Sequence, residues 1–223
     1  GSEEAFRELV SRYSGLVYSA CLRRLGNPHD AEDAAQAVFI TLARKARGVR
    51  GKSLASWLHR AAGYVSMRRH RDRALRQKRE REVVQVAAGE SSERESRAWE
   101  DVRPALDGAV QSLPSRYRQV VVLHYLAGRP VAEVAAALGK PAGTVKSLLS
   151  RGVEKLRAKL SRLTGTQLSV GVLAAALAER AVEAVPAGLV ESSAAMAAGT
   201  AAISSGAASL AEGLASSLVW AKA

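Results

Sequence analysis

The sequence has few of the residues on which several common classes of protein depend. Only one of its 223 residues is cysteine, and 4% are aromatic. The single thiol, Cys21, excludes an intrachain disulfide framework and suits a reducing compartment such as the cytoplasm. So few aromatic side chains argue against a broad, aromatic-lined substrate pocket. A disulfide-stapled secreted domain is therefore the first class to be set aside.

Recognisable catalytic and metal-binding patterns are also missing. The four histidines, His29, His59, His70 and His124, have no metal-ligand spacing with Cys21. No serine lies in a nucleophile-elbow context, and no glycine-rich loop has the spacing that cradles phosphates. We therefore expect no catalytic residue, no metal and no cofactor, and we expect that the protein is not an enzyme.

Positive charge, in contrast, is abundant and unevenly distributed. The formal net charge is +12, yet the residues beyond Gly165 are slightly acidic and are dominated by alanine, serine and glycine. The excess of positive charge thus lies in the first three-quarters of the chain. This pattern predicts a polyanionic partner, with nucleic acid as the first candidate and an acidic membrane surface as the second. The change in composition predicts a boundary near Gly165.

Apolar residues recur at helical spacing in the first part of the chain. A first helix is predicted around residues 6–21, and Gly26 ends it. Asn27 then caps a second helix that begins at Pro28. The expected buried face of this second helix comprises Ala31, Ala34, Ala35, Val38, Phe39 and Leu42.

The other face of the second helix carries Glu32, Asp33 and Gln36. One interpretation is a metal site or an acid–base pair, and the other is a face that contacts a protein or solvent. No histidine or third carboxylate lies at ligand spacing, which favours the second interpretation.

A third apolar set starts after Ser53 and contains Trp57, which we interpret as a core residue rather than a wedge for melted DNA. Arginine and lysine then accumulate over residues 68–81. This basic run is either a phosphate-contacting surface or a solvated linker. The periodicity is lost from Val83, which predicts a linker over residues 83–98.

A second helical unit is predicted from Trp99. Within it, a short helix at residues 131–138 is followed by a tight turn and a longer basic helix at residues 144–160. This order is typical of a helix-turn-helix, whose second helix places its start in the major groove of DNA. Ala135, Ala136 and Gly139 are expected to allow the close approach of the two helices.

The start of the longer helix is rich in side chains that can contact bases and phosphates. The candidate DNA-binding residues are Thr144, Lys146, Ser147 and Arg151. The alternative is an ordinary helical hairpin with a solvated basic face. The spacing favours the DNA-binding interpretation.

The tail beyond Gly165 is expected to form two helices. One contains Leu173, Leu177, Ala181 and Ala184, and the other contains Ile203, Ala207, Leu210, Leu214 and Leu218. Two interpretations of the tail stay open: an element that folds back on the rest of the chain as a built-in inhibitor or sensor, and a flexible alanine-rich linker. The uncharged stretch at residues 192–211 is too weakly apolar to predict a transmembrane span.

Four segments, in this order and at these separations, resemble one known family. They are residues 30–39 (DAEDAAQAVF), 54–60 (LASWLHR), 113–121 (LPSRYRQVV) and 133–147, which contains the helix-turn-helix. They are similar to regions 2.2, 2.3–2.4, 4 and 4.2 of extracytoplasmic-function (ECF) sigma factors of RNA polymerase. The resemblance covers about residues 3–162.

The resemblance implies a role for each segment. Core-polymerase-binding residues near the exposed edge of the second helix would be Glu32, Asp33, Gln36 and Phe39. Residues that bind the melted −10 element would be Arg50, Lys52, Arg60, Tyr64 and Arg68. Residues that bind the −35 duplex would be Thr144, Lys146, Ser147 and Arg151.

Two positions depart from the family pattern. Gly63 stands where the family often has Asn, so a −10 contact is not transferred to that position. Leu148 stands where Arg commonly follows the Lys-Ser pair, which removes one contact from the recognition helix. These departures affect the promoter sequence that is read and not the class of protein.

The fold expected from these observations is all-α. Two small helical domains, sigma region 2 at residues 3–82 and the helix-turn-helix region 4 at residues 99–163, are joined by the basic linker. An alanine-rich helical extension at residues 166–223 follows, and a regulatory element is one of the two interpretations that stay open for it.

The expected partners are promoter DNA and core RNA polymerase, through its β′ clamp helices and β flap. Regulation is expected through an anti-sigma factor or the tail itself, and membrane contact only through an anchor outside residues 1–223. The alternative functions are a stand-alone helix-turn-helix regulator and a membrane-surface protein. The cytoplasm is the expected location.

Overall fold

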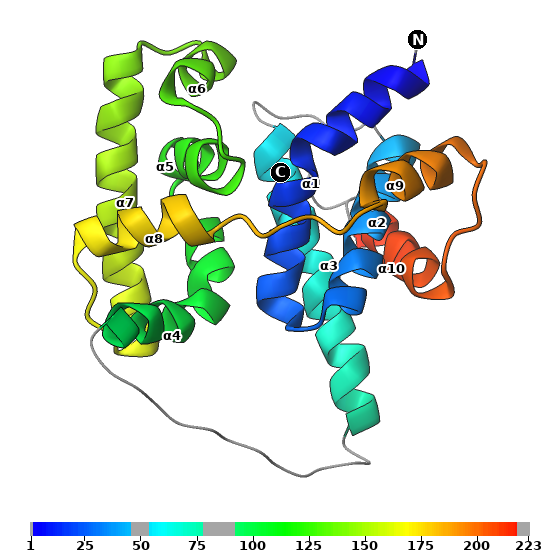
Figure 1. The fold of residues 1–223 in the computed structure, drawn as a ribbon, viewed down its shortest axis with the longest axis horizontal. Helices are drawn as coiled ribbons and strands as arrows, with labels where there is room; N and C mark the ends of the chain where they lie inside the picture. The colour runs from blue at the N-terminus through cyan, green and yellow to red at the C-terminus, as the bar shows by residue number, and fades with distance from the viewer. Residues whose placement is uncertain (1, 46–53, 78–91, 218–223) are drawn as a thin grey trace. The chain divides into compact units, whose positions relative to one another are not determined.

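A computed structural model describes residues 2–45, 54–77 and 92–217, and all regular structure in these ranges is helical (Figure 1). The expected all-α class is confirmed. The chain divides into two compact units. The first comprises Gly1–His70 and Val182–Ala223, and the second comprises Arg71–Ala181.

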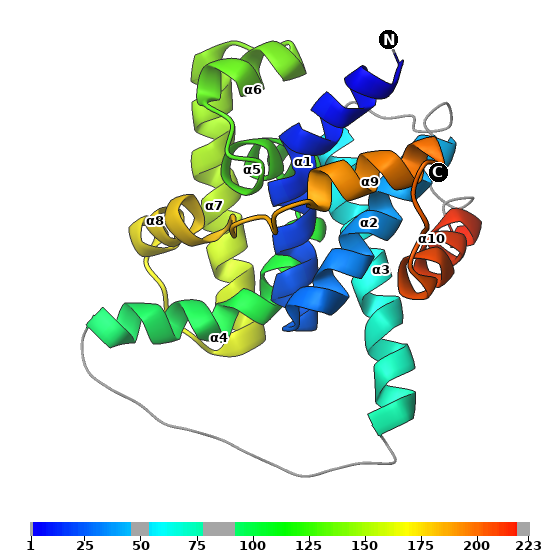
Figure 2. The same ribbon diagram turned by 45° about the vertical axis from the view of Figure 1, so that its right-hand side comes forward.

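The first unit joins the N-terminal helices to the end of the chain. Its helices are α1 (Ser2–Leu25), α2 (Pro28–Lys45), α3 (Leu54–Gln77) as far as His70, α9 (Leu189–Ala198) and α10 (Ser205–Ser217). Both α9 and α10 lie beside α2, as two views of the ribbon show (Figures 1 and 2). Helices that are far apart in the sequence therefore share one core.

The turn between α1 and α2 follows the local signals in the sequence. Gly26 adopts a left-handed backbone with φ of 66°, a conformation that glycine enters without steric cost. The Asn27 side chain then accepts a hydrogen bond of 3.1 Å from the backbone N–H of Asp30. This cap satisfies a donor that the first turn of α2 leaves unpaired. The predicted start of α2 is confirmed.

The second unit is built around the long helix α7. Its elements are α4 (Ser92–Gln111), α5 (Ser115–Val121), a π-helical turn (Val122–Leu126), α6 (Val131–Leu138), α7 (Ala142–Thr164) and α8 (Val170–Arg180). Helix α7 packs against α4, α5, α6 and α8. Helix α4 begins at Ser92, inside the range expected to be a linker, because packed turns can extend a helix into a segment without apolar periodicity.

The extension forms three helices rather than two. Gly165, with φ of 75°, ends α7 at the predicted boundary. Helix α8 buries Leu173 and Leu177 as expected, but it ends at Arg180, so Ala184 lies outside it and is exposed. Helix α9 was not predicted, and α10 begins at Ser205, after Ile203. The tail therefore packs on both units, and the flexible-linker interpretation is wrong for its described residues.

Candidate functional site

The turn between α6 and α7 has the geometry of a helix-turn-helix. Gly139 ends α6 in a left-handed conformation with φ of 59°. The backbone N–H groups of Gly139 and Lys140 donate to the carbonyls of Ala136 and Ala135, at 3.2 and 3.0 Å. These two bonds form a Schellman motif, which satisfies the last carbonyls of α6. Pro141 then starts α7 from an extended backbone.

The four candidate DNA-binding residues of α7 all face solvent. Thr144, Ser147 and Arg151 lie three and four residues apart and thus form one line on the helix, with Lys146 at its edge; all four side chains are exposed. The opposite side of α7 buries Val145, Leu149, Gly152, Val153, Leu156 and Leu160. Burial of the apolar side chains therefore orients the polar side chains toward solvent.

Close helix packing in this unit occurs at a position that the sequence did not predict. Ala136 is exposed, and nothing lies within 4 Å of where a Cβ on Gly139 would sit. The expectation that these two residues allow the close approach of α6 and α7 is wrong. Gly139 instead provides the positive φ with which α6 ends. A Cβ on Gly152 would instead lie 3.0 Å from Cγ2 of Val121. Gly152, on the buried stripe of α7, is the residue that lets α5 approach.

Two polar contacts fix α5 between its neighbours. The Arg118 guanidinium donates to the carbonyl of Gln111 at 2.7 Å and so caps the end of α4. The ring of Tyr117 is buried, and the cationic groups of Arg116 and Lys155 lie 4.7 and 5.6 Å from its centroid. The contact from Lys155, which lies on α7, adds to the packing of α5 on α7.

In the other unit, the candidate −10 residues also form one line. Arg60, Tyr64 and Arg68 are spaced four apart on α3, and all three are exposed. Trp57 is 6% exposed, which confirms its interpretation as a core residue. Arg50 and Lys52 lie outside the described residues.

The candidate polymerase-binding residues on α2 differ in exposure. Asp33 is partly exposed; it accepts a hydrogen bond of 2.9 Å from the Ser204 hydroxyl and lies 3.5 Å from Arg69. Glu32 is also partly exposed. Arg69 makes its shorter ion pair, 2.7 Å, with Asp30.

Gln36 and Phe39 are buried, with 6% and 0% of their surface exposed. Their expected place at an exposed edge is wrong, for two reasons. Phe39 belongs to the apolar face of α2, as its spacing from Ala35 and Leu42 requires. Gln36 lies under α9, where its amide donates to the Ser192 hydroxyl at 3.3 Å.

A buried tyrosine lies where α1, α2 and the extension meet. Burial, and then the carboxylates of Glu32 and Glu183, raise the pKa of Tyr18 above its ordinary value of 10.0. Next to it, the backbone N–H of Glu183 donates to the Ser19 hydroxyl at 2.7 Å. The segment that leads into α9 is thus held on α1.

Comparison with known proteins identifies both units. Residues 9–76 match the family described as Sigma-70 region 2, and residues 103–156 match Sigma-70, region 4. The chain is 30% identical to the ECF RNA polymerase sigma factor SigW of Bacillus subtilis over 173 residues. The aligned region covers 73% of this chain and 92% of SigW. The chain belongs to the family of ECF RNA polymerase sigma factors.

Other relatives agree. The ECF sigma factor SigE of Mycolicibacterium smegmatis is 35% identical over 161 residues, which are 70% of this chain and 61% of SigE. The ECF sigma factor SigM of Mycobacterium tuberculosis is 30% identical over 173 residues, 77% of this chain and 83% of SigM. The two family matches end at residues 76 and 156, so α8, α9 and α10 lie outside both.

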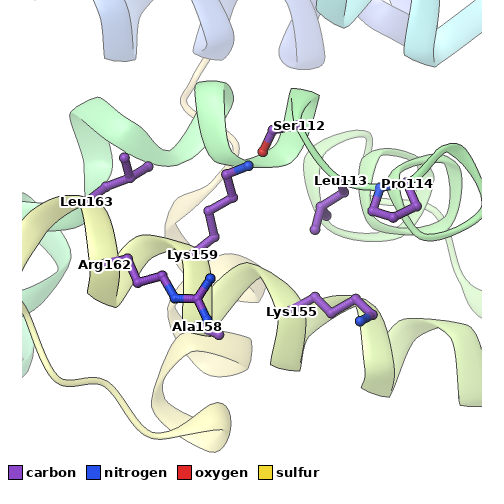
Figure 3. A pocket seen from close by; sticks show the side chains of 8 residues that line it. All are labelled: Ser112, Leu113, Pro114, Lys155, Ala158, Lys159, Arg162 and Leu163. Carbon is purple, nitrogen blue, oxygen red and sulfur yellow. The ribbon is translucent and has the colours of Figure 1, made fainter.

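Region 4 of this sigma factor also carries a basic surface cavity of about 440 Å³ (Figure 3). Lys155, Lys159 and Arg162 of α7 line it together with Leu113 and Pro114, where α4 leads into α5. Its polar groups are the three cations and the hydroxyl of Ser112. In the part of the sigma factor that the structure describes, no helix is long and apolar enough to span a bilayer.

Proposed function

We propose that this sigma factor binds core RNA polymerase and directs it to specific promoters, where it recognises a −35 duplex and a melted −10 element. In this proposal the polymerase performs the chemistry, and the sigma factor supplies recognition. Its place of action is then the cytoplasm, where polymerase and DNA meet.

The observation that carries the proposal is the exposed polar stripe at the start of α7. Thr144, Lys146, Ser147 and Arg151 project from a helix whose other side is anchored in the core of the unit. A helix-turn-helix places this part of its second helix in the major groove, where side chains reach base edges. We assign these four residues to the −35 duplex.

The −10 element is assigned to α3. Arg60, Tyr64 and Arg68 present two cations and one aromatic ring along a single exposed line. Single-stranded DNA is commonly bound by such a combination, because cations follow the phosphates and bases stack on aromatic rings. Arg50 and Lys52 are assigned to the same element from the sequence alone.

Core polymerase is assigned to α2, through its β′ clamp helices. Glu32 and Asp33 supply charged contacts, Gln36 a polar contact, and Phe39 supports the helix from its buried side. The β flap is the proposed partner of region 4. The domain limits proposed from the sequence, residues 3–82 and 99–163 with a linker at 83–98 and an extension at 166–223, belong to this proposal.

The test is run-off transcription with core polymerase from a library of promoters. The sigma factor is expected to yield promoter-specific transcripts that core polymerase alone does not produce. Binding of duplex DNA without any binding of polymerase would replace the proposal with a stand-alone helix-turn-helix regulator.

A further inference from the structure

Helix α2 is buried on all sides over nine consecutive residues, 34–42. An α-helix turns once every 3.6 residues, so nine residues cover its circumference more than twice. A helix on the surface of a small domain normally buries one stripe and exposes the other. Something other than the family core must therefore cover the second side of α2.

The second side of α2 is covered by the extension. The apolar stripe that contains Ala34, Val38 and Leu42 is the side predicted to enter the core, whereas Ala37 and Ile40 lie on the other side and are at most 1% exposed. Helices α9 and α10 both pack on α2 (Figures 1 and 2).

Polar contacts from α2 to the extension occur along much of the helix. Besides the bonds of Asp33 and Gln36 described above, the carbonyl of Ala211 lies 3.4 Å from the Thr41 hydroxyl, whose shorter hydrogen bond, 2.7 Å, goes to the carbonyl of Ala37 within α2. At the end of α2, the Lys45 ammonium donates to the carbonyl of Ala215. The contacts therefore extend from Asp33, in the second turn of α2, to its last residue.

Two glycines of α10 lie against the ends of charged side chains of α2 and α3. A Cβ on Gly206 would overlap the Asp33 carboxylate, and a Cβ on Gly213 would overlap the Arg68 guanidinium. The two glycines are seven residues apart and therefore lie on one side of α10. That side meets a residue assigned to polymerase and a residue assigned to the −10 element.

We propose that α9 and α10 occupy the polymerase-binding side of α2 and must leave it before core polymerase can bind. The extension is then a competitor of polymerase within the same chain. This inference rests on the proposed function, because it takes α2 as the polymerase-binding helix.

The composition of α10 suits an element that can be released. Its sequence contains two large apolar residues, Leu210 and Leu214, among alanine, serine and glycine. Buried apolar area sets most of the free energy of packing, and small side chains contribute little of it. The release of α10 therefore costs less than unfolding the core formed by α1, α2 and α3.

The test compares the affinity for core polymerase of the full chain and of variants that release α10. Ala211→Glu places a carboxylate at a position 1% exposed against α2, whereas Ser209→Glu places the same group on the exposed side of α10. Ala211→Glu is expected to bind polymerase about tenfold more tightly or better, because a released state populated at roughly 0.1–10% lowers the apparent affinity by that fraction. Ser209→Glu is expected to match the wild type.

A second variant and a structural measurement complete the experiment. Gly206→Leu, which adds a side chain next to Asp33 of α2, is expected to act as Ala211→Glu does. Hydrogen exchange of the α10 amides is expected to rise in both variants, while circular dichroism shows that the helices of the units persist. Equal affinity for polymerase in the wild type and both variants overturns the inference, whatever the state of α10.

Failure of the proposed function gives a different result. If no form of the chain binds polymerase, the proposed function fails and the inference falls with it. If all forms bind equally, the inference alone fails. Adding Asp33→Lys to Ala211→Glu is expected to weaken polymerase binding, and an unchanged affinity would show that polymerase does not contact this side of α2, which also overturns the inference.

Discussion

Single residues on α7 show how local spacing decides exposure. Val145 and Leu149 lie on one side of the helix and are buried, and this orients Thr144, Ser147 and Arg151 outward. The spacing of three and four residues that aligns the apolar side chains also aligns the polar ones. The positions of the candidate DNA-binding side chains thus follow from a few turns of one helix.

Arg151→Ala is expected to weaken binding to the −35 duplex by about 1–3 kcal/mol, the usual contribution of a good bidentate base contact. The measurement is the affinity for a duplex that carries the −35 element selected in the run-off assay. Arg162→Ala removes the same charge from the exposed far end of α7 and serves as the matched control. A similar loss in both variants would mean that Arg151 contributes charge alone and reads no base.

Tyr18 gives the first unit a dependence on alkaline pH. Because its pKa is raised in the folded chain, Tyr18 keeps its proton at a pH where the unfolded chain has lost it. The stability that this supplies is complete below about pH 10 and falls as the pH rises further.

Tyr18→Phe is expected to remove that part of the alkaline loss. The free energy of unfolding, measured by urea titration between about pH 8 and 11, should fall less steeply in the variant. A slope for Tyr18→Phe equal to that of the wild type would contradict the role of Tyr18.

At the scale of elements, the packing of α5 on α7 depends on the absence of a side chain. Gly152 faces Val121 and Tyr117, and an added Cβ would meet both. The sequence shows a glycine inside a helical pattern, where glycine normally lowers helix stability. Only the partner helix explains why a glycine is needed there.

Gly152→Leu is expected to destabilise the unit Arg71–Ala181 by about 1–3 kcal/mol, the usual cost of overpacking a core. Calorimetric unfolding of the full chain measures the effect. Gly143→Ala is the control, because nothing lies within 4 Å of its Cβ position. That change is expected to be nearly neutral, since Gly143 lies in the first turn of α7 and its Cβ position is open. A midpoint for Gly152→Leu at or above that of the wild type would refute the packing argument.

Helix α9 shows where an element escapes prediction from periodicity. It has two large apolar residues at its start and continues mostly in alanine and serine, so no apolar stripe marks it. The available signal was the pair of glycines that bracket it, Gly188 and Gly199, with φ of 85° and 77°. Glycine in this conformation is common at helix ends, but it does not indicate what the helix packs against.

At the scale of the whole molecule, the extension belongs to both units. Helix α8 lies in the unit Arg71–Ala181, and α9 and α10 lie in the other. If polymerase displaces α10, thermodynamic linkage requires that α10 in turn weakens polymerase binding by the same factor. The competition can therefore be measured either as the affinity for polymerase or as the release of α10.

Saturating core polymerase is expected to raise hydrogen exchange of the α10 amides in the wild-type chain, by about tenfold or more if release is near complete. Amides of the buried stripe of α7 serve as the internal reference. Unchanged or greater protection of α10 in the complex would show that polymerase binds while the extension stays docked.

Much of this protein was predictable from its sequence, because the signals are local. The cap at Asn27, the stop at Gly26, the stripe of α7 and the boundary at Gly165 each depend on a few neighbouring residues. The four family segments likewise indicated the sigma class without any tertiary information. The exposure of Thr144, Lys146, Ser147 and Arg151 follows from the same local periodicity.

Only the tertiary structure decided how the second side of α2 is used. Ile40 and Gln36 read as one apolar and one polar residue on an outer face, and their burial depends on α9 and α10, more than 140 residues later in the chain. The apolar spacing of each segment predicts a helix but does not identify its partner, because each helix satisfies its own backbone whether or not it meets the other. The same holds for Gly152, where the lack of a side chain is explained only by the helix that approaches it.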